Sequence, residues 1–197
     1  MTDAMTIDEA AVLAAACAGD RTAFASLVKV YQRRAYAAAY GFTRNRDEAM
    51  DIAQDAFVKA YRAMDRFDPQ MPFYPWLYRI IRNTALNHLK KKKRRGETSL
   101  DAMMEYGYDA QDESRTPEGE ADLADLKSSL SDALECLTPD QREIIRLRHM
   151  LELSYTEIAQ CLGIPQGTVM SRLHGARKAL KAAVEQESNK AREAGVL

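Results

Sequence analysis

The sequence predicts an all-α fold made of two small helical domains that are joined by a flexible acidic linker. Apolar residues recur every three or four positions along most of the chain, which is the spacing of one face of a helix. No segment alternates polar and apolar residues convincingly, as a half-buried strand would. Residues 96–122 are acidic, lack a sustained period and contain glycine and proline. We therefore expect domains at residues 1–95 and 123–185, a linker at 96–122, and a tail at 186–197.

The first domain is expected to hold helices whose starts carry recognisable caps. Thr6 and Glu9 have the spacing of a capping box, and Asn45 is a favourable N-cap. Pro75 fits the first turn of a helix, where its missing N–H costs nothing. These signals and the apolar spacing predict helices over residues 7–18, 22–40, 45–64 and 76–93.

The second domain is expected to begin with a helix over residues 123–137 and to continue through a second, strongly capped helix. Thr138, Pro139 and Gln141 supply a cap, a first-turn proline and the glutamine of a capping box. The apolar stripe that follows would bury this helix against its neighbours.

The most informative motif is a predicted helix-turn-helix over residues 154–173. Ser154 and Glu157 form a capping box, and Gly163 sits where a helix commonly ends in a left-handed residue. After the turn, apolar residues recur at helical spacing and leave an outward face of Met170, Ser171, His174 and Arg177. Two capped helices can simply pack together, but small polar and basic side chains at an exposed helix start also suit a DNA major groove.

Charge is strongly segregated along the chain, although the formal net charge is only −1. Residues 76–95 carry arginines and lysines without one acid, whereas residues 97–125 carry a single arginine among many acids. Residues 142–181 are basic again. Two basic blocks on either side of an acidic segment indicate polyanion contacts at separate places.

Several classes of function are disfavoured by the sequence. No run of about 18 apolar residues is present, and the alanine-rich start is too short and too acidic for a signal peptide, so we expect a cytoplasmic protein with no membrane insertion of its own. The histidines are isolated and no metal or phosphate motif appears, so no enzyme activity, catalytic residue, metal or cofactor is expected. The widely spaced Cys17, Cys136 and Cys161 fit small buried side chains in a reducing compartment, and a redox role stays open.

Two faces of the first domain are candidate binding surfaces. On the third helix, a polar stripe includes Asp51, Gln54 and Asp55, which suits either solvent or a protein partner. On the fourth helix, basic and amide side chains are expected to point outward, and the loop before it is expected to expose two aromatic rings beside Trp76. Such a mixture suits an unpaired nucleic acid strand, although the three rings are also compatible with a core position, which is the better interpretation for Trp76. The candidates are Phe73, Tyr74, Arg79, Arg82, Asn83, Asn87 and Lys90.

Three segments together resemble one family. They are DIAQDAFVKAY at residues 51–61, FYPWLYRIIRNTA at residues 73–85 and GTVMSRL at residues 167–173. They resemble the extracytoplasmic-function, or group 4, sigma factors of bacterial RNA polymerase, and the resemblance covers residues 20–184. It implies a sigma-2 domain and a sigma-4 domain in a subunit that gives core RNA polymerase its promoter choice.

The resemblance also implies roles for particular residues. Asp51, Gln54 and Asp55 would bind core polymerase, and the aromatic, basic and amide residues around the fourth helix would capture and melt the −10 element of promoter DNA. The −35 element would be recognised by the second domain through Thr168, Ser171, Arg172, His174, Arg177 and Lys178. An anti-sigma factor is implied as a further partner.

Two residues and one segment of the chain depart from the family pattern. Met170 and Gly175 stand where relatives commonly carry basic residues, and the basic run at residues 90–95 is long, which suggests additional phosphate contacts.

A stand-alone helix-turn-helix regulator is the alternative function. Such a regulator would have no use for the acidic stripe, and reversing its charges distinguishes the two.

Overall fold

The computed structural model describes residues 8–96 and 130–193, with side chains described as far as residue 186, and every regular element in these ranges is helical. The chain divides into two compact units, the first mainly within residues 1–102 and the second mainly within residues 103–197. This confirms the predicted all-α fold with two domains. The predicted linker at 96–122 lies almost entirely outside the described residues.

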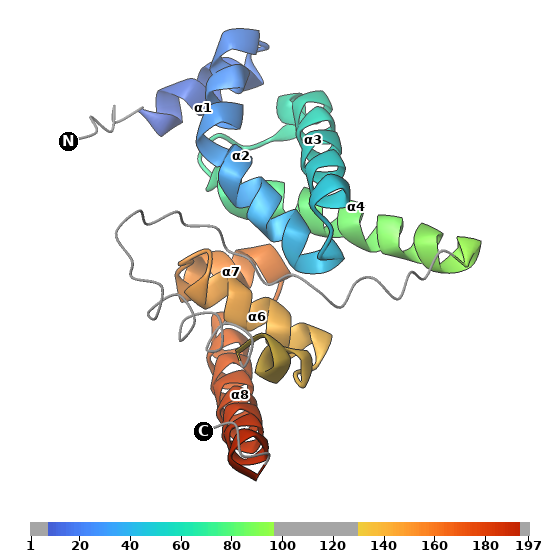
Figure 1. Cartoon of the computed structure of the whole chain (residues 1–197). Coiled ribbons are helices and arrows are strands. Elements are labelled where there is room, and N and C mark those ends of the chain that lie inside the picture. Colours follow the sequence, from blue (N-terminus) through green and yellow to red (C-terminus); the bar gives the residue numbers. More distant parts are fainter. Residues whose placement is uncertain (1–7, 97–129, 194–197) are drawn as a thin grey trace, which may run out of the picture. The chain divides into compact units, whose positions relative to one another are not determined.

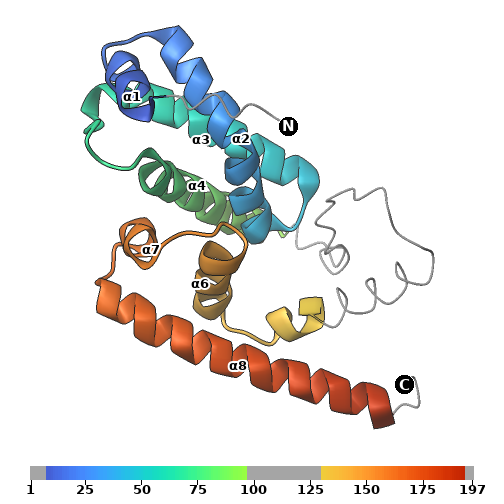
Figure 2. The ribbon, with the colours of Figure 1, turned by 90° about the vertical axis from the view of Figure 1, so that its left-hand side faces the viewer.

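The first unit is built from three packed helices and a shorter one. Helices α2 (Arg21–Thr43), α3 (Arg46–Arg62) and α4 (Phe73–Arg95) pack against one another, and α1 (Glu9–Cys17) packs against α2 (Figures 1 and 2). A short 3-10 helix, η1 (Met64–Arg66), follows α3. The largest fully buried side chains of this unit are Leu27, Phe73, Leu77 and Ile81. Because α4 gives three of these four residues, its core face fixes which of its residues face outward.

The helix starts of the first unit are capped largely as expected. The Asn45 side chain accepts a hydrogen bond from the Glu48 amide at 3.0 Å and opens α3. The Asp20 carboxylate accepts from the amide of Thr22 at 2.7 Å at the start of α2. Asp8 caps α1, while the predicted cap Thr6 lies outside the described residues. Each cap satisfies backbone donors that the first turn leaves without a partner.

The start of α4 differs from the sequence prediction. The helix begins at Phe73, so Pro75 is its third residue. A proline is tolerated there because the first N–H groups of a helix have no acceptor within the helix. The two residues before it are therefore helical, and their rings turn toward the core.

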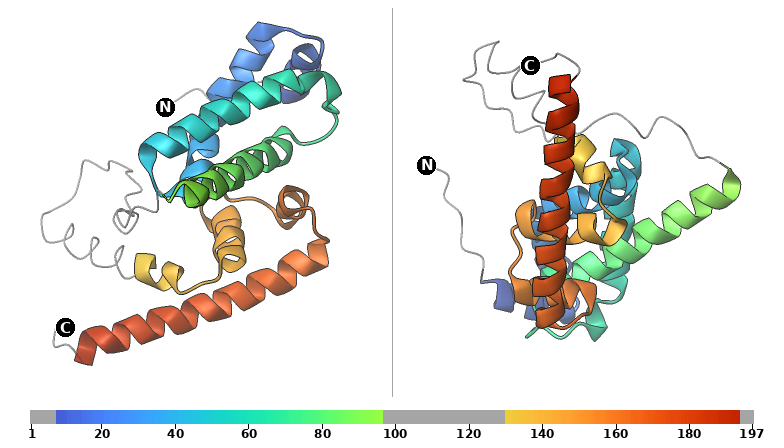
Figure 3. Two further views of the ribbon diagram at one scale, coloured as in Figure 1. Left: turned by 90° about the vertical axis from the view of Figure 1, so that its right-hand side faces the viewer. Right: turned by 90° about the horizontal axis from the view of Figure 1, so that it is seen from below.

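The second unit contains the expected helix-turn-helix. Residues 130–135 are helical and lead to α6 (Pro139–His149), α7 (Tyr155–Leu162) and α8 (Gln166–Glu193). Helix α6 packs on α8, which is drawn as one uninterrupted helix in Figure 3. Buried apolar side chains of this unit are Ile144, Leu147, Val169 and Leu173. Helix α8 continues into the segment 186–197 that the sequence analysis assigned to a tail.

Caps and arginine contacts hold the turns of the second unit. The predicted capping box at Thr138 and Gln141 is present in both directions. Arg142 donates hydrogen bonds to three main-chain carbonyls in the turn before α6, those of Leu134, Glu135 and Leu137, at 2.9–3.0 Å. Arg148 donates to the carbonyl oxygen of Leu153 at 2.9 Å and so fixes the turn before α7. These contacts therefore hold the chain segments on both sides of α6.

Candidate protein and nucleic-acid interfaces

The acidic stripe of α3 lies on the surface, as its spacing predicted. Asp51, Gln54 and Asp55 are all exposed, while Ile52 and Ala53 between them are buried. The three polar residues therefore share one face of α3 that points away from the core. Their position fits a docking surface for a protein partner.

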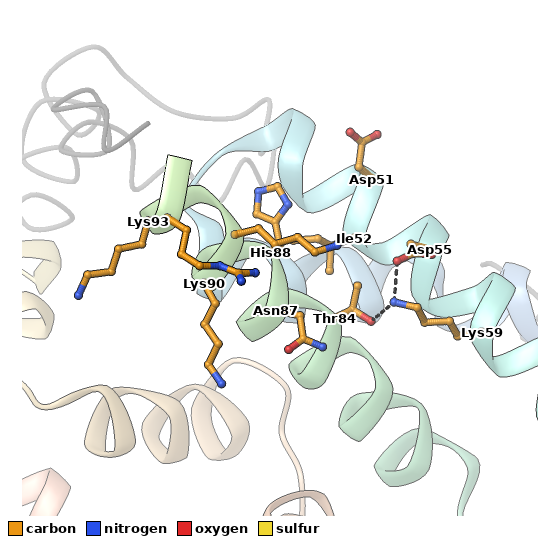
Figure 4. Close-up of a pocket in the computed structure, with 11 residues that line it drawn as sticks. Asp51, Ile52, Asp55, Lys59, Thr84, Asn87, His88, Lys90 and Lys93 are labelled. Atoms are coloured by element: carbon orange, nitrogen blue, oxygen red, sulfur yellow. Dashed lines mark hydrogen bonds and ion pairs between the residues drawn. The ribbon is translucent and has the colours of Figure 1, made fainter. Parts of the chain in front are cut away.

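The two carboxylates of the stripe have different surroundings. Lys59 Nζ lies 2.7 Å from Oδ2 of Asp55, one turn earlier on α3. The same ammonium donates a hydrogen bond to Thr84 Oγ1 of α4 at 3.0 Å (Figure 4). Among the described residues, no cation pairs with Asp51. Within the described residues, the Asp55 carboxylate is thus paired with a cation and the Asp51 carboxylate is not.

The outer face of α4 carries the expected basic and amide side chains. Arg79, Asn83, Asn87 and Lys90 are exposed, and Arg82 is half-buried. Their spacing of four, four and three residues places the exposed four on one continuous face of the helix. Amides can pair with base edges and cations with phosphates, so this face has the chemistry of a nucleic-acid surface.

Both candidate surfaces border one groove between α3 and α4. Asp51 and Asp55 lie on its α3 side, and Asn87, Lys90 and Lys93 lie on its α4 side (Figure 4). One wall is therefore acidic and the other basic. A protein partner on α3 and a nucleic acid on α4 would be immediate neighbours.

The prediction that Phe73 and Tyr74 are exposed on a loop is wrong. Both are buried residues in the first turn of α4. Their ring centroids lie 5.3 Å and 5.8 Å from that of Tyr31 on α2, and the Arg34 guanidinium lies 4.0 Å from the centre of the Tyr74 ring. The physical reason is the early start of α4, which places both residues on the helix face that packs on α2.

Trp76 differs from these two rings because it is only half-buried. Its ring lies 4.8 Å from that of Phe67 and 5.7 Å from that of Phe73, between centroids. The core thus supports the indole on one side without enclosing it. The sequence analysis expected the reverse, with Trp76 the better candidate for a core position.

An ion-pair cluster between α3 and α4 was not found from the sequence. The Glu48 carboxylate lies 2.6 Å from Lys92 Nζ and 3.2 Å from His88 Nε2. Glu48 is in the first turn of α3, and its two partners lie one turn apart near the end of α4. No local motif signals this contact, because it joins residues 40 or more positions apart through helix packing.

The start of α8 presents most of the predicted duplex-binding residues to solvent. Ser171, Arg172, His174, Arg177 and Lys178 are exposed, and Thr168 is half-buried. The Ser171 hydroxyl donates to the carbonyl oxygen of Thr168 at 3.1 Å, which leaves its lone pairs free to accept a further bond. Apolar residues on the opposite face fix the orientation of the helix, namely Val169, Leu173 and Ala176, all buried.

Positive charge gathers where α6 ends beside α8. The pKa of His149 lies below its ordinary value, because partial burial and the nearby Arg177 and Arg148 disfavour the imidazolium form. His149 and Arg177 are therefore close enough to interact, although they lie on different helices. An anionic ligand at this place would relieve the repulsion between them.

The described residues lack the features of two other classes of protein. Within residues 8–96 and 130–193, no three or more histidine, cysteine, aspartate or glutamate side chains gather as metal ligands would. The same part of the chain holds no helix with both the length and the apolar character needed to cross a bilayer.

The two units match separate models of one protein family. Residues 27–95 match sigma-70 region 2, and residues 127–180 match sigma-70 region 4. The first match covers α3 and α4 with both candidate surfaces of the first unit, and the second covers the helix-turn-helix.

Curated relatives and a solved structure agree with these matches. The chain is 37% identical over 171 residues to RNA polymerase sigma-H factor of Pseudomonas aeruginosa, covering 85% of this chain and 89% of the relative. It is 36% identical over 170 residues to ECF RNA polymerase sigma factor SigW of Bacillus subtilis, covering 83% and 89%. The fold also resembles the sigma factor RpoE of Bartonella quintana, solved in complex with the anti-sigma factor NepR, with a TM-score of 0.63, 29% identity and coverage of 82% of this chain and 96% of that one.

Region 2 and region 4 thus occur in order on the two helical units, and relatives more than one-third identical span most of the chain. The protein belongs to the extracytoplasmic-function group of the sigma-70 family of RNA polymerase sigma factors.

Proposed function

We propose that this chain is a sigma factor that binds bacterial core RNA polymerase and directs transcription initiation at its own class of promoters. The observation that carries the proposal is the match of region 2 and region 4 models to the two helical units of one chain. A stand-alone regulator would not need the exposed acidic stripe of α3, and no observation favours that alternative.

In the first domain, the polymerase-binding residues are Asp51, Gln54 and Asp55, and α4 binds the −10 element. The exposed amides of Asn83 and Asn87 offer donors and acceptors to unpaired bases, while Arg79, Arg82 and Lys90 bind the backbone. Because Phe73 and Tyr74 are buried, we assign base stacking at the start of α4 to the half-exposed Trp76. Stacking of about 1–3 kcal/mol per base helps to offset the cost of strand opening.

In the second domain, the start of α8 enters the major groove of the −35 element. Thr168, Ser171 and Arg172 lie in its first two turns, where base edges are within reach in helix-turn-helix proteins. His174, Arg177 and Lys178 follow along the exposed face and suit base or phosphate contacts. Met170, 56% exposed beside them, offers an apolar contact where relatives commonly carry a basic residue.

We further propose that the protein is held in check by an anti-sigma factor. The support is the related sigma factor RpoE, whose solved structure is a complex with the anti-sigma factor NepR. Covering the α3 stripe would suffice for inhibition, because the protein could then no longer reach the polymerase.

Reconstituted transcription tests the proposal. Core polymerase and the purified chain are mixed with fragmented genomic DNA of the source bacterium, and the new 5′ ends are sequenced. We expect start sites that share two spaced elements upstream. Specific DNA binding without initiation, alongside an active control sigma factor, would instead favour the stand-alone regulator.

A matched pair of variants tests the polymerase contact. Reversing both charges of the stripe, Asp51→Lys with Asp55→Lys, should abolish core binding and initiation while leaving DNA binding by the free chain in place. Asp65→Lys, a charge reversal at an exposed residue of η1 outside the stripe, is the control and should retain activity. Equal loss in both variants would contradict the assignment of the α3 stripe.

A further inference from the structure

The basic run at the end of α4 is not uniform. Lys90, Lys91, Lys93 and Arg94 are exposed, whereas Lys92 is half-buried. At 100° per residue, Lys90 and Arg94 lie on the side of α4 roughly opposite to Lys92. Lys90 and Arg94 also continue the face of Asn83 and Asn87 at spacings of three and four residues. Lys92 therefore points away from the outward face to which Lys90 and Arg94 belong.

Glu48 holds Lys92 on the inner side. Its carboxylate lies 2.6 Å from Lys92 Nζ and 3.2 Å from Nε2 of His88, which is four residues before Lys92 on the same face of α4. The Glu48 amide is in turn bound by the Asn45 cap at 3.0 Å. The backbone of Glu48 is thus anchored at the start of α3, from which its carboxylate reaches Lys92 on α4.

The Glu48–Lys92 pair is better protected from solvent than the Asp55–Lys59 pair of the acidic stripe. The side chains of Glu48 and Lys92 are 20% and 29% exposed, against 53% and 47% for Asp55 and Lys59. Partial burial reduces screening by water and salt, so the pair persists at salt concentrations that dissociate exposed pairs. A lysine held in this way has its charge already neutralised and is not available to a phosphate.

We propose that Glu48 limits which cations of α4 contact DNA. By pairing with Lys92 it withholds one lysine of the basic run, whereas Lys90 and Arg94, on the outward face with Asn83 and Asn87, stay available to phosphates. The inference deepens the proposed function, because it states which cations of α4 meet the nucleic acid.

The salt dependence of DNA binding by the free, full-length chain tests this inference. Binding of a fluorescein-labelled single-stranded oligonucleotide is measured by anisotropy at several KCl concentrations, and the log–log slope counts the phosphates neutralised, about 0.7 per contact. We expect Lys92→Met to leave the slope unchanged and the matched control Lys90→Met to reduce it by about 0.7. Glu48→Gln should steepen it by a similar amount, because Lys92 is released.

The double variant makes the test specific. Combining Glu48→Gln with Lys92→Met should return the slope to that of the unmodified chain, which a general loss of structure would not do. The inference is overturned if Lys92→Met flattens the slope as much as Lys90→Met, or if Glu48→Gln weakens binding without steepening the slope. Circular dichroism confirms that each variant is folded. Because no polymerase is present, failure here and failure of the sigma-factor proposal remain separate results.

Discussion

Asp51 and Asp55 occupy the same stripe of α3 but differ in what a partner gains from each. Lys59 already lies 2.7 Å from Asp55 and is itself tied to Thr84 at 3.0 Å. A basic partner must therefore compete with Lys59 at Asp55, whereas no described cation pairs with Asp51. Because both residues lie on the stripe, only their different surroundings predict which of them contributes more to binding a partner.

We accordingly expect Asp51→Asn to weaken binding to core polymerase more than Asp55→Asn. A loss of about tenfold, or 1.4 kcal/mol, is expected for Asp51→Asn and less than about threefold for Asp55→Asn. Titration of labelled core polymerase with each variant measures the two affinities. Equal losses would show that Lys59 leaves Asp55 when the partner binds.

The thiols of Cys17 and Cys136 should also react at different rates with an alkylating reagent, because their surroundings differ. Burial, and secondarily the Asp68 carboxylate, raises the pKa of the Cys17 thiol, which also donates to the Phe67 carbonyl oxygen at 3.6 Å. Only the thiolate reacts, so at about pH 7.5 iodoacetamide should modify exposed Cys136 before Cys17. Peptide mapping by mass spectrometry gives both rates. Raising the pH should narrow the difference, and equal rates near neutral pH would contradict the expected order.

At the scale of elements, two glycines of the second domain have opposite effects on its stability. Gly175 lies inside α8 and Gly163 ends α7 with φ of +66°, and a Cβ at either position would meet nothing within 4 Å. Gly175→Ala should therefore stabilise the domain by about 1 kcal/mol through helix propensity. Gly163→Ala should destabilise it by about 1 kcal/mol, because a side chain disfavours the left-handed conformation. Urea unfolding of both variants measures the difference, and a shift of the same sign in both would contradict this account.

Local sequence signals predicted elements well where the chemistry is local. The caps at Asn45, Thr138 and Ser154 depend on residues within three positions of each other, and all three are present. The start of α4 was misplaced because a proline is compatible with several positions of a first turn. The burial of Phe73 and Tyr74 then depends on packing against Tyr31, which no local pattern contains.

In the candidate site, too, features within one helix were predicted from the sequence, whereas features that join two helices were not. Periodicity placed Asp51, Gln54 and Asp55 together, and it placed Asn83, Asn87 and Lys90 together, because each set lies on one helix. The Glu48 cluster and the Lys59 bridge to Thr84 join two helices, so they depend on how α3 packs against α4. Sequence analysis therefore identified the surfaces, and only the structure shows which charges within them are already neutralised.

At the scale of the whole molecule, a net charge of −1 conceals two separate basic faces. One follows α4 in the first unit and the other follows the start of α8 in the second. Mutations at distant sites without shared partners combine additively in free energy. The two faces should therefore contribute independently to duplex DNA binding when both engage the same DNA.

Paired substitutions test this independence. Lys90→Met with Arg94→Met removes two exposed cations from α4, and Arg172→Met with Lys178→Met removes two from α8. Each pair should reduce the log–log salt slope for duplex DNA by about 1.8, and all four together by about 3.6, at about 0.9 per phosphate. Anisotropy with a duplex long enough to reach both domains measures the slopes. A combined reduction clearly below the sum would mean that the two faces compete for one stretch of DNA, and the division of promoter contacts between the domains would then be wrong.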